Sequence, residues 1–208
     1  MAFSHTTAPP HHIPAARMTF RELITEDLDT ALRRDPAARN RLEVALSYPG
    51  VHALWAHRLS HRIWKRGGNG AQILARMIQQ FTRTFTGVDI HPAAHLGRRL
   101  FIDHATGVVI GETASVGEDC LIFHGVTLGG QQMIKGKRHP TVGDRVMIGA
   151  GAKVLGPINI GSDAKIGANA VVVRDVPDSG IALGVPAKVR KPKRPIPDCM
   201  NIDPSVFI

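Results

Sequence analysis

Residues 142–172 read VGDRVMIGAGAKVLGPINIGSDAKIGANAVV, and an aliphatic residue returns at every sixth position of this stretch. The series consists of Val142, Ile148, Val154, Ile160, Ile166 and Val172. Each hexad supplies one short strand and a turn, so three hexads make a triangular coil of about 18 residues with its aliphatic side chains stacked inward. Because one coil cannot bury a core alone, neighbouring coils must stabilise one another. The stretch therefore predicts a parallel β-helix.

The same period continues upstream of this stretch. Aliphatic residues recur at Ile90, Leu96, Ile102 and Val108, and then, after a shift of two residues, at Ile110, Val116, Ile122 and Leu128. Residues 129–141 interrupt the repeat, and a loop of that length is uncommon in a compact domain unless it is functional. We therefore expect the β-helix to span residues 87–188 and to eject one loop at 129–141.

Before residue 87 the apolar period is helical instead. A first helix is indicated by Leu23, Leu28 and Leu32. It should end at Asp35-Pro36, because the residue before a proline avoids the α region. Two later helices are marked by Val51, Trp55, Leu59 and Ile63, and by Ile73, Met77, Ile78 and Phe81. The predicted fold class is therefore α+β, with a helical domain at 17–86 between a flexible tail at 1–16 and the β-helix, and a flexible C-terminal tail at 189–208.

The composition indicates the cellular compartment and limits the classes of binding partner. The formal net charge of +9 favours a phosphate-bearing partner, but no basic stretch is interleaved with aromatic residues as single-stranded nucleic acid would require. No run reaches the roughly 18 apolar residues of a membrane span. Cys120 and Cys199 form no CxxC pair, which argues against a cysteine zinc site and indicates a reduced, cytoplasmic setting. We expect no metal, nucleic-acid or membrane binding.

Four short motifs carry a resemblance to a known family. They are VDIHP at 88–92, DHATG at 103–107, TLGG at 127–130 and RHP at 138–140. In these motifs the chain closely resembles the serine acetyltransferases. The resemblance implies a left-handed β-helix that transfers an acetyl group from acetyl-CoA to the hydroxyl of L-serine, the first step of cysteine biosynthesis. Acetyl-CoA is then a co-substrate, and no cofactor is bound permanently.

Such a reaction needs a base, because a serine hydroxyl attacks a thioester poorly until its proton is removed. The resemblance implies that His104 is this base and that Asp89 holds its imidazole in the required tautomer. The two residues are 15 positions apart, three short of a full coil. Spacing alone does not stack them, so their pairing rests on the resemblance.

Serine itself is a zwitterion, and its two charged groups need opposite charges around them. By the resemblance, Asp35 and Asp103 bind the ammonium group. Arg138 binds the carboxylate, which suits the planar fork of a guanidinium. His139 helps to bind serine and to steady the oxyanion.

The resemblance also implies contacts for acetyl-CoA and for partners. Gly130, Ala150 and Lys165 match acetyl-CoA positions, in a groove between neighbouring subunits of a homotrimer or a dimer of trimers. Ile208 matches the C-terminal isoleucine by which this family docks into O-acetylserine sulfhydrylase. L-Cysteine, which has sulfur in place of the serine oxygen, is expected to be a feedback inhibitor. The loop sequence QQMIKGK at 131–137 departs from the glycine-rich loop of many relatives.

Other interpretations stay open at this stage. A hexad β-helix could acetylate a sugar or antibiotic hydroxyl with a similar base, or serve as a noncatalytic scaffold. It could also be a γ-type carbonic anhydrase, which holds zinc with three histidines. The candidates for that site are His91, His95, His104 and His124. His57 and His61, four positions apart, could share a ligand as well, although we expect them on a helix surface or at a subunit contact.

Overall fold

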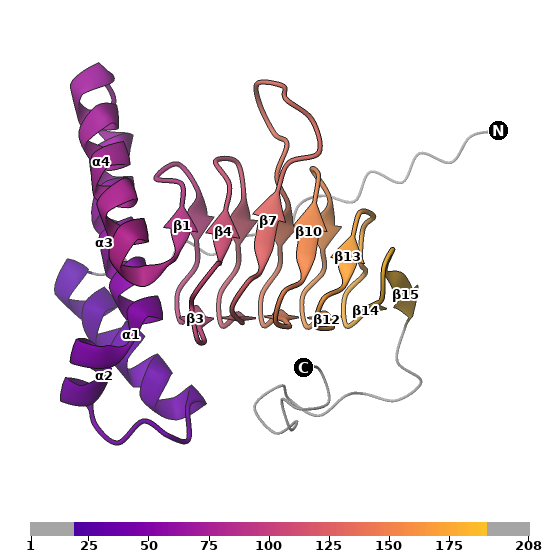
Figure 1. Cartoon of the computed structure of the whole chain (residues 1–208), viewed down its shortest axis with the longest axis horizontal. Coiled ribbons are helices and arrows are strands. Elements are labelled where there is room, and N and C mark those ends of the chain that lie inside the picture. The colour runs from indigo at the N-terminus through magenta and orange to yellow at the C-terminus, as the bar shows by residue number, and fades with distance from the viewer. Residues whose placement is uncertain (1–18, 191–208) are drawn as a thin grey trace.

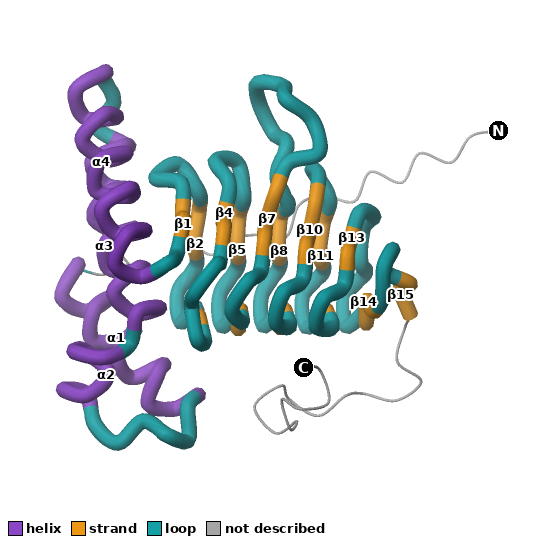
Figure 2. Tube along the Cα trace, viewed as in Figure 1, coloured by secondary structure: helices purple, strands orange, loops and turns teal. Residues whose placement is uncertain are grey.

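The computed structural model describes residues 19–190; the predicted N-terminal tail, most of the predicted C-terminal tail and Ile208 lie outside the described residues. Within the described range, four helices precede fifteen short strands (Figure 1). The helices stand at one end of a stack of coils, whose strands line up in three sheets (Figure 2). The architecture is a left-handed parallel β-helix, and we call its four helices the helical cap.

Local signals set the limits of the helices. α1 (Phe20–Arg34) begins at a capping box between Thr19 and Glu22 and ends at Asp35, as predicted. α3 (Pro49–Lys65) starts with proline at its first position, and α4 (Asn69–Thr86) ends at Gly87, whose φ of 70° is left-handed. The apolar pattern does not predict α2 (Arg41–Ser47). None of these four described helices has the length and apolarity needed to cross a membrane.

The strands form three sheets. The first contains β1 (Asp89–Ile90), β4 (Val109–Ile110), β7 (Thr127–Gly129), β10 (Lys153–Leu155) and β13 (Val171–Val172). The second contains β2 (His95–Leu96), β5 (Ser115–Val116), β8 (Thr141–Val142) and β11 (Asn159–Ile160). The third contains β3 (Phe101–Ile102), β6 (Leu121–Ile122), β9 (Met147–Ile148), β12 (Lys165–Ile166), β14 (Ile181–Leu183) and β15 (Lys188–Arg190). Among the described strands only β15 runs antiparallel, against β14, so residues 189 and 190 still belong to a sheet.

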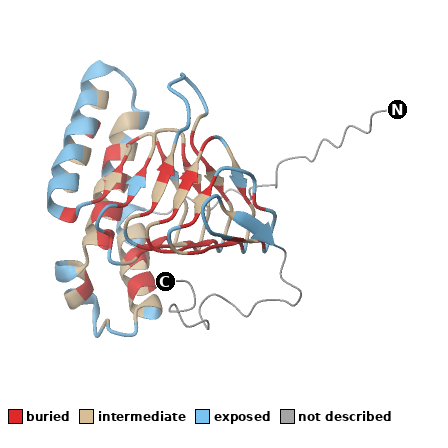
Figure 3. Ribbon diagram, turned by 45° about the vertical axis from the view of Figure 1, so that its right-hand side comes forward, coloured by how far each residue is buried: buried red, intermediate tan, exposed pale blue. Residues whose placement is uncertain are grey.

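The hexad residues stack in register along the coils. Ile110 pairs with Leu128, 18 positions later, and Val142 pairs with Ile160 in the same way. The ejected loop lengthens one coil, so Val116 pairs with Val142 across 26 positions. These residues belong to one buried hydrophobic cluster, and Figure 3 shows buried positions along the stacked coils. Each such aliphatic side chain contributes about 1.5–3 kcal/mol by leaving water.

Close packing and a hydrogen bond join the helical cap to the first two coils. Gly50 of α3 lies against the backbone of Ile102, where a Cβ atom would overlap the carbonyl oxygen. Arg34, at the end of α1, donates a hydrogen bond to the carbonyl of Asp119 at 2.7 Å. These contacts hold the end of α1, and therefore Asp35, beside the β-helix.

Candidate active site

The turn between β3 and β4 holds the DHATG motif. Six residues, 103–108, separate these strands, whereas four residues, 123–126, separate β6 from β7 one coil later. The two extra residues account for the shift in the hexad pattern. His104 and Ala105 both have a left-handed backbone, with φ of 55° and 46°, which is uncommon outside glycine. The His104 side chain is 75% exposed at this edge between the third and first sheets, which we call the His104 edge.

Two carboxylates from distant parts of the chain meet beside His104. Asp103 Oδ1 lies 3.9 Å from Nε2 of His104, and Asp35 accepts a hydrogen bond from the Tyr48 hydroxyl at 2.6 Å. Burial raises the pKa of Asp103, His104 lowers it, and the nearby charge of Asp35 raises it. Burial and the bond to Asp35 raise the pKa of Tyr48 to about 12, so the phenol stays a donor. The structure thus groups Asp35, Asp103 and His104 in a site suited to a cation.

A second group of predicted residues lies on a different edge. The ejected loop leaves the first sheet after β7 and enters the second sheet at β8 (Figure 2). Where it returns, the backbone N–H groups of Arg138 and His139 both donate to the Thr113 hydroxyl, at 3.0 and 3.1 Å. The Arg138 guanidinium binds Glu112 at 2.5 Å. Thr113 therefore fastens the loop to the edge between the first and second sheets, the His139 edge.

His139 is held in one orientation. It is 8% exposed, and its ring fills the space that Gly111 leaves, where a Cβ atom would overlap the ring. The backbone N–H of Thr113 donates to Nδ1 of His139 at 3.2 Å, so the proton of the neutral ring is on Nε2. Burial lowers the pKa of His139, which favours that neutral form. The residue can therefore donate a hydrogen bond from Nε2.

Asp89, the predicted partner of His104, is bound by helix α4. Its Oδ1 accepts a hydrogen bond from the amide of Gln79, and its Oδ2 accepts one from Arg83 at 3.1 Å. Both donors come from the helical cap, since α4 runs beside β1 at the start of the β-helix (Figure 1). The pairing of Asp89 with His104 stays a prediction.

Asp89 lies on the first sheet, between the two edges, and pairs with Val109, the residue that directly follows the DHATG turn. The charges of Asp89 and Arg138 both act on the neighbouring His91, whose pKa is lowered to about 4, chiefly by burial. In residues 19–190 of one chain, the predicted base and the predicted arginine thus lie in two groups. The His104 edge carries Asp35, Asp103 and His104, the His139 edge carries Arg138 and His139, and Asp89 lies on the first sheet between them.

The three residues predicted to contact acetyl-CoA lie at different places on the β-helix. The N–H of Gly151 donates to the carbonyl of His124 at 2.8 Å, which stacks Ala150 one coil beyond His124 along the His104 edge. Lys165 lies in β12 of the third sheet and is 4% exposed, so it offers a ligand little surface in a single chain. Gly130 begins the loop at the His139 edge and is exposed.

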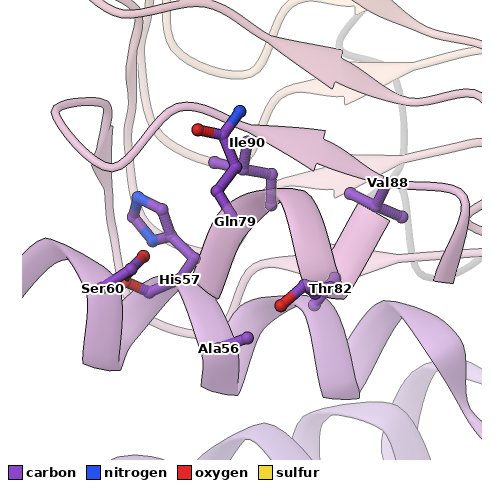
Figure 4. Close-up of a pocket in the computed structure, with 8 residues that line it drawn as sticks. Ala56, His57, Ser60, Gln79, Thr82, Val88 and Ile90 are labelled. Carbon is purple, nitrogen blue, oxygen red and sulfur yellow. Dashed lines mark hydrogen bonds between the residues drawn. The ribbon is translucent and has the colours of Figure 1, made fainter. Parts of the chain in front are cut away.

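His57 of α3 does not lie on the helix surface, which is one of the two positions expected for it. It is 5% exposed, and its ring stacks on His61 with 5.5 Å between centroids. It borders a cavity of about 10 Å³ between α3, α4 and β1 (Figure 4). Burial lowers the pKa of His57 to about 3. In the described part of the chain, no group of histidine, cysteine, aspartate and glutamate side chains is arranged to hold a metal ion.

Several residues that hold the site together are not identified from the sequence. Tyr48, the single tyrosine of the chain, binds Asp35. Glu112 and Thr113 bind the returning loop, and Gln79 binds the carboxylate at β1. A lone tyrosine just before the proline that opens a helix is a detectable signal. Glu112, Thr113 and Gln79 have no such signal in the sequence. Their partners are determined by the length and path of the loop and by the packing of α4.

Known proteins are similar to this chain in sequence. The family described as bacterial transferase hexapeptide (six repeats) matches residues 139–174. A serine acetyltransferase of Mycobacterium tuberculosis is 64% identical over 171 residues, which cover 82% of this chain and 73% of that protein. A serine acetyltransferase of Helicobacter pylori is 55% identical over 165 residues, which cover 79% of this chain and 95% of that protein.

Solved structures share the fold as well. A Neisseria gonorrhoeae serine acetyltransferase in complex with serine superposes with a TM-score of 0.78 at 48% identity, over 82% of this chain and 69% of that one. A serine acetyltransferase in complex with cysteine superposes with a TM-score of 0.80 at 42% identity, over 84% of this chain and 67% of that one. The superposed parts therefore amount to more than four fifths of this chain.

Proposed function

The chain belongs to the serine acetyltransferase family, and we propose that it builds each active site from two neighbouring subunits. It is an acyltransferase that moves an acetyl group from acetyl-CoA to the hydroxyl of L-serine, which gives O-acetyl-L-serine and CoA. The co-substrate brings an acyl carbon already activated as a thioester. The observation that supports L-serine as the acceptor is the pair Asp35 and Asp103 beside the exposed His104. Two carboxylates next to a base suit an amino-acid acceptor better than an uncharged sugar.

His104 acts as the general base. Its imidazole takes the proton of the serine hydroxyl while Oγ attacks the thioester carbonyl carbon and a C–O bond forms. Negative charge then develops on the carbonyl oxygen, and a donor aimed at it lowers the barrier; the Nε2–H of His139 supplies that donor. When the intermediate collapses, the C–S bond breaks and the CoA thiolate takes the proton from His104, which returns the enzyme to its starting state.

The charged groups of serine are bound from both edges. Its ammonium group lies between Asp35 and Asp103, and its carboxylate receives the guanidinium of Arg138 from the neighbouring subunit. Asp89 of that neighbour orients the imidazole of His104. L-Cysteine carries the same two charged groups, so it competes with serine for this pocket.

A closed ring of three chains supplies such sites. Two edges of one triangular prism cannot face the same substrate, but an edge of one prism can face an edge of the next. In a homotrimer every chain has one neighbour on each side, so three equivalent sites form; a dimer of trimers would retain them. Acetyl-CoA lies in the groove, against Ala150 and Lys165 of one chain and Gly130 of the other.

Two further assignments rest on the sequence alone. Ile208, outside the described residues, is the proposed contact with O-acetylserine sulfhydrylase, because an apolar side chain beside an α-carboxylate can be captured by backbone amides. A cytoplasmic location, expected from the cysteine pattern, accords with a role in cysteine biosynthesis.

Mixed trimers test the shared site. His104→Ala and Arg138→Ala should each be inactive, but a trimer that contains both variants keeps one intact site in three. An equal mixture that assembles at random therefore recovers about one quarter of the wild-type rate. CoA release is followed with a thiol reagent, with L-serine or a galactoside as acceptor. No recovery would show that each site lies within one chain, and equal rates with the galactoside would overturn the acceptor.

A further inference from the structure

One contact between the helical cap and the proposed active site involves a residue without a role so far. Gln79, on α4, borders the same small cavity as Ile90 of β1 (Figure 4). Its amide nitrogen donates to Oδ1 of Asp89, and its amide oxygen accepts a hydrogen bond from Arg76 at 2.9 Å. A guanidinium only donates and a carboxylate only accepts, so these two contacts determine which way the amide faces.

The second donor to this carboxylate is held less firmly. Arg83 reaches Oδ2 of Asp89 at 3.1 Å, but its side chain is 55% exposed. An exposed ion pair of this kind contributes little and is screened by salt. Gln79 is partly buried and is itself oriented by Arg76, so it is the better-defined partner. The two carboxylate oxygens offer about four acceptor positions, which leaves room for an imidazole N–H.

We propose that Gln79 is a positioning residue that holds the Asp89 carboxylate in the orientation in which it receives the imidazole N–H of His104. The inference rests on the proposed function, since it requires Asp89 to act on His104. It also gives the helical cap a part in turnover, because α4 supplies the donor. Removal of the donor should therefore affect the chemical step rather than the binding of either substrate.

The chain offers a matched pair of substitutions for the test. Gln79→Met keeps the size of the side chain and removes the hydrogen bond. Gln80→Met changes the next residue of the same helix, which is exposed. We expect Gln79→Met to lower kcat by about 10- to 100-fold, as small displacements of catalytic groups do, with unchanged KM values for serine and acetyl-CoA. Gln80→Met should keep the wild-type kcat, and thermal melting monitors folding of both variants.

A second mutation separates positioning from a general structural effect. In an Asp89→Asn background, Gln79→Met should lower kcat no further, because residues that act as a unit are not additive. Multiplied losses would overturn the inference. A wild-type kcat for Gln79→Met beside an impaired Asp89→Asn would overturn it and leave the proposed function intact. A wild-type kcat for Asp89→Asn would overturn the role of Asp89 in the proposed function itself. If Gln79→Met folds poorly, Gln79→Glu keeps the shape and places a like charge beside Asp89, with the same loss of kcat expected.

Discussion

Replacing Gly111 by alanine should displace His139 without disturbing the backbone. The φ angle of Gly111 is not in the left-handed region, so alanine can adopt it. The new Cβ would overlap Cδ2 and Nε2 of the His139 ring and lie 2.9 Å from Cε1, whereas ordinary contact begins near 3.4 Å. The ring must therefore retreat, and its bond of 3.2 Å from the Thr113 N–H is strained or lost. A misplacement of about 1 Å can cost up to 10²-fold in rate.

We expect Gly111→Ala to lower kcat/KM for serine by about 10- to 100-fold, which is about 1.4–2.7 kcal/mol of transition-state stabilisation. The assay is CoA release at several serine concentrations. Gly70→Ala is the control, since a Cβ at position 70 meets no atom within 4 Å. The double variant Gly111→Ala/His139→Ala should match His139→Ala alone, because the clash is gone. Wild-type kinetics for Gly111→Ala, or a double variant far worse than His139→Ala, would refute the reasoning.

Three further predictions concern the base, the buried histidine and the core. His104→Ala should lower kcat by about 10²–10⁴-fold with an unchanged melting temperature, because the side chain is exposed; activity close to wild type in the folded variant would contradict the mechanism. His57 has a folded pKa of about 3, below its unfolded value of about 6.5, so the unfolded state binds more protons between these values. The free energy of unfolding should therefore fall by about 2 kcal/mol from pH 6.5 to pH 5 relative to His57→Gln, measured by urea titration; equal profiles would contradict the buried neutral ring. Ile148→Ala should cost about 2–5 kcal/mol, because Ile148 is fully buried between Ile122 and Ile166; a loss below about 1 kcal/mol would mean that the column repacks.

The β-helix is predictable from the sequence because the length of its repeat also determines the register in which its strands pair. A hexad pattern states which side chains face inward and how far apart stacked residues lie, so Ile110 above Leu128 follows from counting. The shift of two residues before Ile110 is visible in the sequence, and the structure shows that it is the wide turn that exposes His104.

The helical cap is less predictable, because packing rather than period decides which faces are buried. The seven residues of α2 are too few for a recurring apolar pattern. Leu59, expected on the apolar face of α3, is 45% exposed, while His57 on the same helix is buried. Met77 and Phe81 correctly mark α4 as a helix, yet both are exposed in the single chain.

The sequence by itself determined the repeat, the position of the ejected loop and the motifs that contain the base and the loop arginine, since each of these is local in the chain. Only the tertiary structure decided that Asp35 meets Asp103, that Asp89 is bound by α4, and that the predicted base and the predicted arginine lie on different edges. Those contacts depend on where α1 and α4 pack against the first two coils and on how the loop returns to Thr113. No period in the sequence encodes them, because they join segments whose separation along the chain is set by loops and helix packing rather than by the length of a coil.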